Sequence, residues 1–149
     1  MKKSTIILSL GFAVILVATS GCSKSQDQQP VAAQNQDSVA FQGKWTGQEA
    51  QANTEEAPVL TFSGANLELH EANTNIWYKA SFTLHEDTTP KQLIVVITEC
   101  ADPKYVGRTA NAIYKLEKEV LTISANEPGN PTVPTSFNDK NSRNVVFKR

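Results

Sequence analysis

Apolar side chains recur at every second position along most of the chain after residue 41, and short polar, Gly or Pro segments interrupt them. In residues 78–84, for example, Tyr78, Ala80, Phe82 and Leu84 alternate with polar side chains. A period of two puts alternate side chains on opposite faces of a β-strand, so one face meets a core and the other meets water. Helical periodicity is almost absent, so the pattern predicts an all-β domain.

The pattern divides into eight predicted strands. They span residues 42–49, 59–63, 66–71, 76–85, 92–99, 108–116, 120–125 and 143–148. Most connections, such as 64–65 and 117–119, are long enough for a hairpin and too short for a parallel crossover. Pairing the first strand with the last would remove both exposed edges, so we expect a small eight-stranded antiparallel up-and-down barrel. Residues 51–57 and 126–140 would then be loops at the barrel ends.

One predicted strand differs from the rest. The segment Leu93-Ile94-Val95-Val96-Ile97 is apolar at consecutive positions, so both of its faces are apolar and something should cover the outer one. Trp77 has the opposite parity to Tyr78 and is expected outside the barrel. We therefore regard the segment 93–97, together with Trp77, as the favoured contact surface for another protein.

The N-terminus has the order of a secretion signal: basic Lys2 and Lys3, an apolar stretch over 6–18, and small residues before Cys22. The apolar stretch is shorter than the roughly 20 residues that span a bilayer, which disfavours a retained transmembrane anchor. Ser20-Gly21-Cys22 resembles the bacterial lipoprotein pattern. The resemblance implies that Cys22 is acylated and that residues 1–21 are cleaved. The alternative is an ordinary signal peptide that is cut near Ala18.

The lipoprotein resemblance also implies a location. Ser23 follows the cysteine, and a residue other than aspartate there implies transfer to the outer membrane of the cell envelope, on its periplasmic face. Residues 23–40 are almost free of bulky apolar side chains, so they read as a disordered tether. The predicted organisation is a signal peptide at 1–21, a lipidated tether at 22–40 and the barrel domain at 41–149.

The charge and cysteine content of the chain argue against a nucleic-acid-binding protein and against a domain stabilised by a disulfide. Loss of residues 1–21 leaves 12 of the 14 basic residues against 15 acidic ones, without a long run of either sign, so nucleic acid is not an expected partner. After acylation of Cys22, Cys100 has no cysteine to pair with in the domain, and no histidine lies near it in sequence. The domain must therefore be stabilised by packing and not by a disulfide.

The chain shows no pattern of catalytic residues. His70 and His85 are far apart and lack metal-ligand spacing, and there is no glycine-rich phosphate loop and no nucleophile elbow. The carboxylate pairs Glu55-Glu56 and Glu86-Asp87 read as solvated loop charges rather than an acid and a base in distinct environments. We therefore expect no enzyme activity, no metal and no cofactor.

The domain resembles a family of lipocalin-like domains found in uncharacterised, planctomycete-type proteins. The resemblance rests on the order of Phe41-Gln42-Gly43-Lys44-Trp45, Leu60-Thr61-Phe62, Ala112-Ile113-Tyr114-Lys115-Leu116 and the ending Val145-Val146-Phe147-Lys148-Arg149. It implies a lipocalin-like barrel and no established activity. Gly43-Lys44-Trp45 is similar to the glycine–tryptophan signature of lipocalins. That likeness implies that Trp45 packs at the closed end under a basic residue, Arg149 or secondarily Lys148.

The resemblance has two local departures. Ala112 stands where the family often has a glycine before Ile113. Glu117-Lys118 replaces the Asp-Gly turn usual in the family. Because a positive φ at Lys118 would cost about 1 kcal/mol, we expect a longer turn here.

Two functions remain open from the sequence. The first is a membrane-tethered binding module that holds a small apolar or amphipathic molecule, with Phe62, Tyr78, Phe82 and Tyr114 as candidate contacts. The second is an envelope interaction or structural module whose barrel is filled by its own side chains. Many large inward residues in so short a domain favour the filled interior; they are Phe62, Tyr78, Phe82, Leu84, Tyr114 and Phe147.

Overall fold

The computed structural model describes residues 36–48 and 57–149, which belong to one compact unit, Val31–Arg149. The predicted signal peptide, Cys22 and residues 23–35 lie outside the described residues, as do Glu55 and Glu56. Within the described ranges, no helix is both long and apolar enough to span a bilayer.

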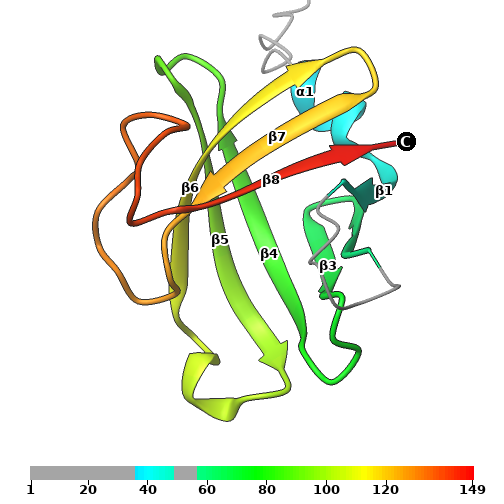
Figure 1. Ribbon diagram of the computed structural model, residues 1–149, viewed down its shortest axis with the longest axis vertical. Coiled ribbons are helices and arrows are strands. Elements are labelled where there is room, and N and C mark those ends of the chain that lie inside the picture. The colour runs from blue at the N-terminus through cyan, green and yellow to red at the C-terminus, as the bar shows by residue number, and fades with distance from the viewer. Residues whose placement is uncertain (1–35, 49–56) are drawn as a thin grey trace, which may run out of the picture. The chain divides into compact units, whose positions relative to one another are not determined.

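Eight strands form a closed antiparallel up-and-down barrel, in which each strand pairs with its neighbours in the chain and the first pairs with the last (Figure 1). The strands are β1 Gly43–Gly47, β2 Val59–Ser63, β3 Asn66–His70, β4 Trp77–His85, β5 Lys91–Cys100, β6 Thr109–Glu117, β7 Val120–Ala125 and β8 Arg143–Lys148. The predicted fold class is confirmed, and the strand bounds differ from the prediction by no more than two residues. The architecture is consistent with a lipocalin-like fold.

The barrel closes where β1 meets β8. Thr46 lies opposite Lys148 and Gly47 opposite Phe147, and the Gln48 N–H donates to the Val146 carbonyl over 2.7 Å. At this seam the backbone of β1 also passes close to Pro58, because a Cβ on Gly47 would lie 2.4 Å from Pro58 Cγ. The closure therefore requires glycine at position 47.

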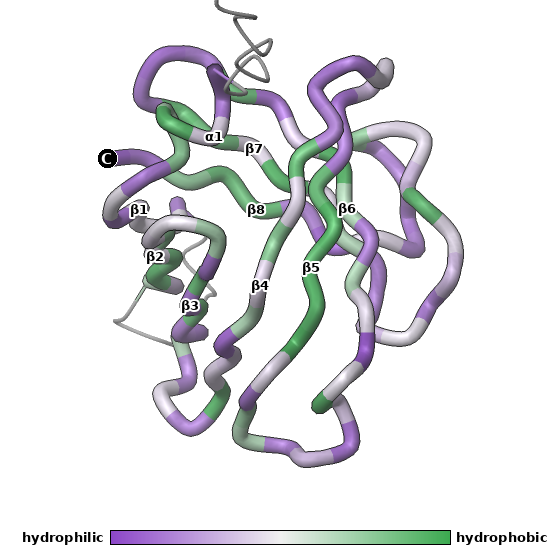
Figure 2. Tube along the Cα trace, turned by 180° about the vertical axis from the view of Figure 1, so that it is seen from behind, coloured by the Kyte–Doolittle hydropathy of each residue, from purple (hydrophilic) through white to green (hydrophobic). Residues whose placement is uncertain are grey.

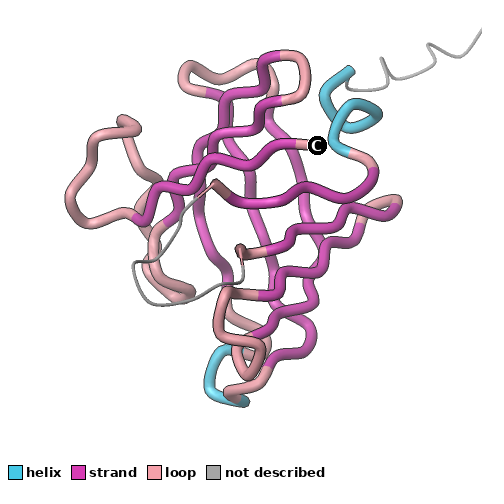
Figure 3. Tube along the Cα trace, turned by 45° about the vertical axis from the view of Figure 1, so that its right-hand side comes forward, coloured by secondary structure: helices cyan, strands magenta, loops and turns pink. Residues whose placement is uncertain are grey.

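Two short helices lie at opposite ends of the barrel (Figure 3). The 3₁₀ helix η1, Pro103–Tyr105, follows β5, and the α-helix α1, Gln36–Phe41, precedes β1. The helix α1 corrects the predicted boundary of the tether at residue 40, because ordered structure already includes residues 36–40. A six-residue helix has too little periodicity to stand out from a polar sequence, and α1 is held by tertiary contacts instead.

Aromatic side chains fill the end of the barrel that α1 covers. Phe41 is fully buried, with its ring centroid 4.8 Å from that of Phe62 and 5.0 Å from that of Tyr114, both edge to face. Phe82 packs edge to face against Phe62 at 5.0 Å. We call these four residues the aromatic plug. Such pairs add about 0.5–1.5 kcal/mol each beyond the apolar area that they bury, so this end of the barrel is closed.

The outer face is covered unevenly. On β6 and β7, Ile113 and Ser124 point outward and are nevertheless fully buried. Nearby, Asn111 Nδ2 donates to the Asn130 carbonyl over 2.9 Å, which holds the loop 126–142 near these strands. The hydrophobic track along β5 is visible in Figure 2, and Val96 on its outer side stays 39% exposed. Trp77 lies on the outer face, half-buried, with Lys79 Nζ 5.7 Å from its ring centroid.

The turn between β6 and β7 is shorter than expected. Glu117 pairs directly with Val120, which leaves Lys118 and Glu119 as a two-residue turn, and Lys118 has φ 55°. The expectation of a longer turn is wrong. The paired β6–β7 ladder compensates for the cost of about 1 kcal/mol of a non-glycine residue in this region.

Candidate binding cavity

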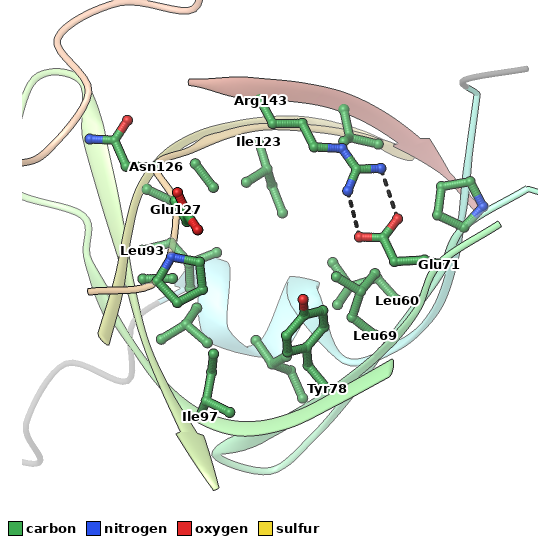
Figure 4. Close-up of a pocket in the computed structure, with 18 of the residues that line it drawn as sticks. Leu60, Leu69, Glu71, Tyr78, Leu93, Ile97, Ile123, Asn126, Glu127 and Arg143 are labelled. Atoms are coloured by element: carbon green, nitrogen blue, oxygen red, sulfur yellow. Dashed lines mark hydrogen bonds and ion pairs between the residues drawn. The ribbon is translucent and has the colours of Figure 1, made fainter. Parts of the chain in front are cut away.

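The barrel is hollow at the end opposite the aromatic plug. A cavity of about 410 Å³ opens there, and strands β2 to β8 all contribute to its lining (Figure 4). This volume is within the range of about 300–1,000 Å³ that is typical of small-molecule sites. The expectation of a filled interior is therefore corrected: the aromatic plug fills one end of the barrel and the other end holds a cavity.

The wall of the cavity is apolar. Its apolar residues are Pro58, Leu60, Leu67, Leu69, Leu93, Val95, Ile97, Ala110, Ala112, Ile123, Ala125, Pro128, Val145 and Phe147. Small residues occupy several positions that face the interior, and Ala110 and Ala112 come from the same strand. β6 and β7 have small alanine side chains facing the cavity, and these leave space inside the barrel. At the plug end, aromatic rings occupy the corresponding space.

An ion pair stands at the edge of the cavity. Arg143, the first residue of β8, donates to both carboxylate oxygens of Glu71, and the Nη2–Oε2 distance is 2.8 Å. The Glu71 side chain is only 11% exposed and that of Arg143 is 44% exposed. Two-pronged contacts between guanidinium and carboxylate fix geometry as well as charge. Glu71 follows β3 directly, so the pair joins that end of β3 to the start of β8.

Tyr78 projects into the open space, with its hydroxyl toward the middle of the cavity in Figure 4. Its ring lies 6.3 Å from that of Tyr105. Burial raises the pKa of the Tyr78 phenol, and Tyr105 and Glu71 raise it further. Tyr78 therefore stays an uncharged hydroxyl at neutral pH, able to donate or accept one hydrogen bond.

Asn126 and Glu127 line the other side of the opening (Figure 4). The Asn126 amide nitrogen donates to the Thr132 carbonyl over 2.9 Å, and its oxygen accepts from the Ser142 hydroxyl over 2.8 Å. Glu127 is exposed and accepts a hydrogen bond from the Tyr105 hydroxyl at 2.9 Å. Hydrogen bonds within the loop thus position this rim.

The structure places the four predicted ligand contacts in two different parts of the barrel. Tyr78 lines the cavity, whereas Phe62, Phe82 and Tyr114 belong to the aromatic plug and not to the cavity lining. Strand parity correctly places all four inside, but it carries no information on depth along the barrel axis. The structure therefore corrects the assignment of the three plug residues.

Glu71 and Arg143 are site residues that the sequence analysis missed. Both lie on inward parity: Arg143 shares a face with Val145 and Phe147, and Glu71 with Leu67 and Leu69. A charged residue at an inward position near a strand end was the available signal.

The residues predicted for the closed end come together. Trp45 is fully buried, and its indole N–H donates to the Phe41 carbonyl over 2.7 Å. The guanidinium carbon of Arg149 lies 4.5 Å from the Trp45 ring centroid, while Arg149 Nη2 donates to the Gln42 carbonyl over 2.7 Å. Gly43 opens β1 with φ 104°, a conformation that favours glycine.

A polar cluster attaches α1 to the barrel. Asp37 Oδ2 accepts from the Tyr114 hydroxyl at 2.7 Å and lies 2.6 Å from Lys91 Nζ. Burial and the hydrogen bond to Asp37 raise the pKa of Tyr114 well above its ordinary value of 10.0.

Alkaline pH should therefore destabilise the protein. The folded state keeps Tyr114 neutral, but the unfolded state ionises near pH 10.0, so this contribution is complete below that pH and is lost as the pH rises above it. We expect the free energy of unfolding in urea, followed by circular dichroism, to fall above pH 10.0 more steeply for the native protein than for Tyr114→Phe. Equal slopes would contradict the prediction.

His70 and Cys100 form local contacts. His70 Nε2 lies 2.7 Å from Glu68 on the same strand, and Cys100 Sγ donates to the Asp102 carbonyl over 2.9 Å. Across residues 36–48 and 57–149, no three His, Cys, Asp or Glu side chains gather as metal ligands would. Neither the known protein families nor the curated proteins nor the solved structures contain a match to this chain.

Proposed function

We propose that the protein is a lipid-anchored binding protein of the bacterial cell envelope, whose barrel holds a small apolar or amphipathic molecule. The observation that carries the proposal is the half-open cavity of about 410 Å³ with an apolar wall and a polar rim. Binding sites for small molecules typically combine such walls with a few convergent polar groups. The alternative, an interaction module with a filled barrel, loses support because only one end is filled.

The energetics favour a ligand. Burial of apolar surface contributes about 25 cal/mol per Å², so a molecule that covers the apolar surface of the cavity wall would gain several kcal/mol. The aromatic plug and α1 close the far end, so the ligand would enter past Glu71, Tyr78 and Arg143. No strand needs to separate for this entry.

A fluorescence titration tests the binding proposal. The mature chain from residue 22, with Cys22→Ala, keeps all the residues that form the barrel and α1. Titration with N-phenyl-1-naphthylamine, an uncharged apolar fluorophore, should give saturable one-to-one binding with a Kd in the micromolar range, about −8 kcal/mol at 1 μM. Fluorescence that rises linearly without saturation would refute a cavity site.

The anchor is tested separately through Cys22. When the full chain is expressed in a bacterium with labelled palmitate, the native protein should take up label and remain with the outer membrane. Cys22→Ala should lose the label completely, because stable anchoring depends on the acyl chains. Cys100→Ala is the matched control and should be labelled like the native protein. Absence of label in the native protein would refute the anchor and leave the cavity proposal standing.

A further inference from the structure

The charged groups at the cavity opening influence which ligands the cavity can bind. Among the lining residues in the described part of the chain, the charged side chains are Glu71, Glu127 and Arg143, two carboxylates against one guanidinium. Any polar head group of a ligand whose apolar part fills the cavity would come to rest among them (Figure 4). Their pairing therefore decides which head group is accepted.

Arg143 is already engaged. Its guanidinium donates to both oxygens of Glu71, whose side chain is 11% exposed. A ligand carboxylate that displaced Glu71 would leave a largely buried carboxylate without its partner, which is strongly unfavourable. A ligand carboxylate that did not displace Glu71 would enter a rim whose described charged side chains, two carboxylates and one guanidinium, sum to −1, and it would be repelled by that net charge. An anionic head group is thus disfavoured in either position.

Tyr78, in contrast, favours an uncharged polar head group. Its hydroxyl faces the open space and makes no hydrogen bond within the part of the chain that the structure describes. The Tyr78 side chain is half-buried, so a ligand that covers its hydroxyl must supply a hydrogen-bond partner, which an uncharged polar head group can do. A phenol can donate to an ester or amide oxygen and can accept from an alcohol.

We infer that the cavity selects amphiphiles with an uncharged head group, such as an alcohol, ester or amide, over fatty acids of the same chain length, and that Tyr78 binds the head while the Glu71–Arg143 pair excludes carboxylates. This inference rests on the proposed function. It makes Glu71 and Tyr78 the residues that determine specificity.

The test is competition between two ligands that differ only in the head group. 1-Dodecanol and dodecanoate each displace N-phenyl-1-naphthylamine from the mature Cys22→Ala chain at neutral pH. We expect dodecanoate to bind at least about tenfold more weakly, a factor that an unfavourable charge contact readily supplies. Dodecanoate that binds as tightly as dodecanol would overturn the inference.

Three variants test which residues determine the preference for the head group. Glu71→Gln removes one of the carboxylates that repel an anionic head group and should strengthen dodecanoate binding about tenfold with little change for dodecanol. Glu117→Gln removes the same charge at the closed end and should change neither affinity. Tyr78→Phe should weaken the binding of dodecanol severalfold more than it weakens the binding of the fluorophore. If Glu71→Gln retains native fluorophore affinity, and so a native cavity, but gains no affinity for dodecanoate, the role of the ion pair is refuted.

The outcomes separate the two proposals. If the fluorophore itself does not bind, the proposed function fails. If the fluorophore binds and dodecanol and dodecanoate compete equally well, the proposed function stands and the inference about the head group fails.

Discussion

Trp45→Ala is expected to lower the free energy of unfolding by about 3–5 kcal/mol, the range for deletion of a large buried aromatic side chain. Trp45 is fully buried, donates its indole N–H to the Phe41 carbonyl and lies under Arg149. Its loss would leave a void, an unpaired carbonyl and a cation without its aromatic partner. Because a domain has only about 5–15 kcal/mol of stability, the variant should be close to unfolding at ambient temperature.

Urea unfolding followed by circular dichroism measures this loss without relying on tryptophan fluorescence. Trp77→Ala is the matched control, since Trp77 is half-buried on the outer face, and it should cost about 1 kcal/mol. Trp45→Phe keeps most of the volume and loses the N–H donor, so we expect a loss of about 1–3 kcal/mol. If Trp45→Ala costs no more than Trp77→Ala, the closed end does not depend on Trp45.

Val95→Trp is expected to abolish ligand binding while the barrel stays folded. Val95 points inward, lines the cavity and lies between Phe82 and Ala110 in the sheet. An indole at this position would occupy space that a ligand otherwise fills, so affinity for N-phenyl-1-naphthylamine should fall by at least about tenfold, or 1.4 kcal/mol. Since the indole would enter the cavity and displace no packed side chain, stability should be unchanged or slightly raised.

Val96→Trp provides the control, because Val96 is the next residue and points to the outside, where it is 39% exposed. We expect native affinity for this variant. Overpacking a filled core usually costs about 1–3 kcal/mol. A loss of stability of that size in Val95→Trp, measured by thermal unfolding, would show that the barrel is filled at this depth and would contradict the cavity.

Much of the fold could be predicted from local pattern. The alternation in Tyr78, Ala80, Phe82 and Leu84 identifies a strand and its inner face, because the pleat of a strand fixes side-chain direction at a period of two. Short connections then require antiparallel neighbours. For the same reason Trp77 is correctly placed outside.

The sequence determined the strands, their inner faces and the closed antiparallel order, since each follows from periodicity and connection length. The tertiary structure alone decided depth along the barrel: Phe82 fills the closed end and Tyr78 lines the cavity, although both lie on the same face of β4. It also places Glu71 next to Arg143, which is 72 positions away in the chain, and it places α1 over one end of the barrel. These features depend on the register and curvature of the whole sheet, which no local pattern encodes.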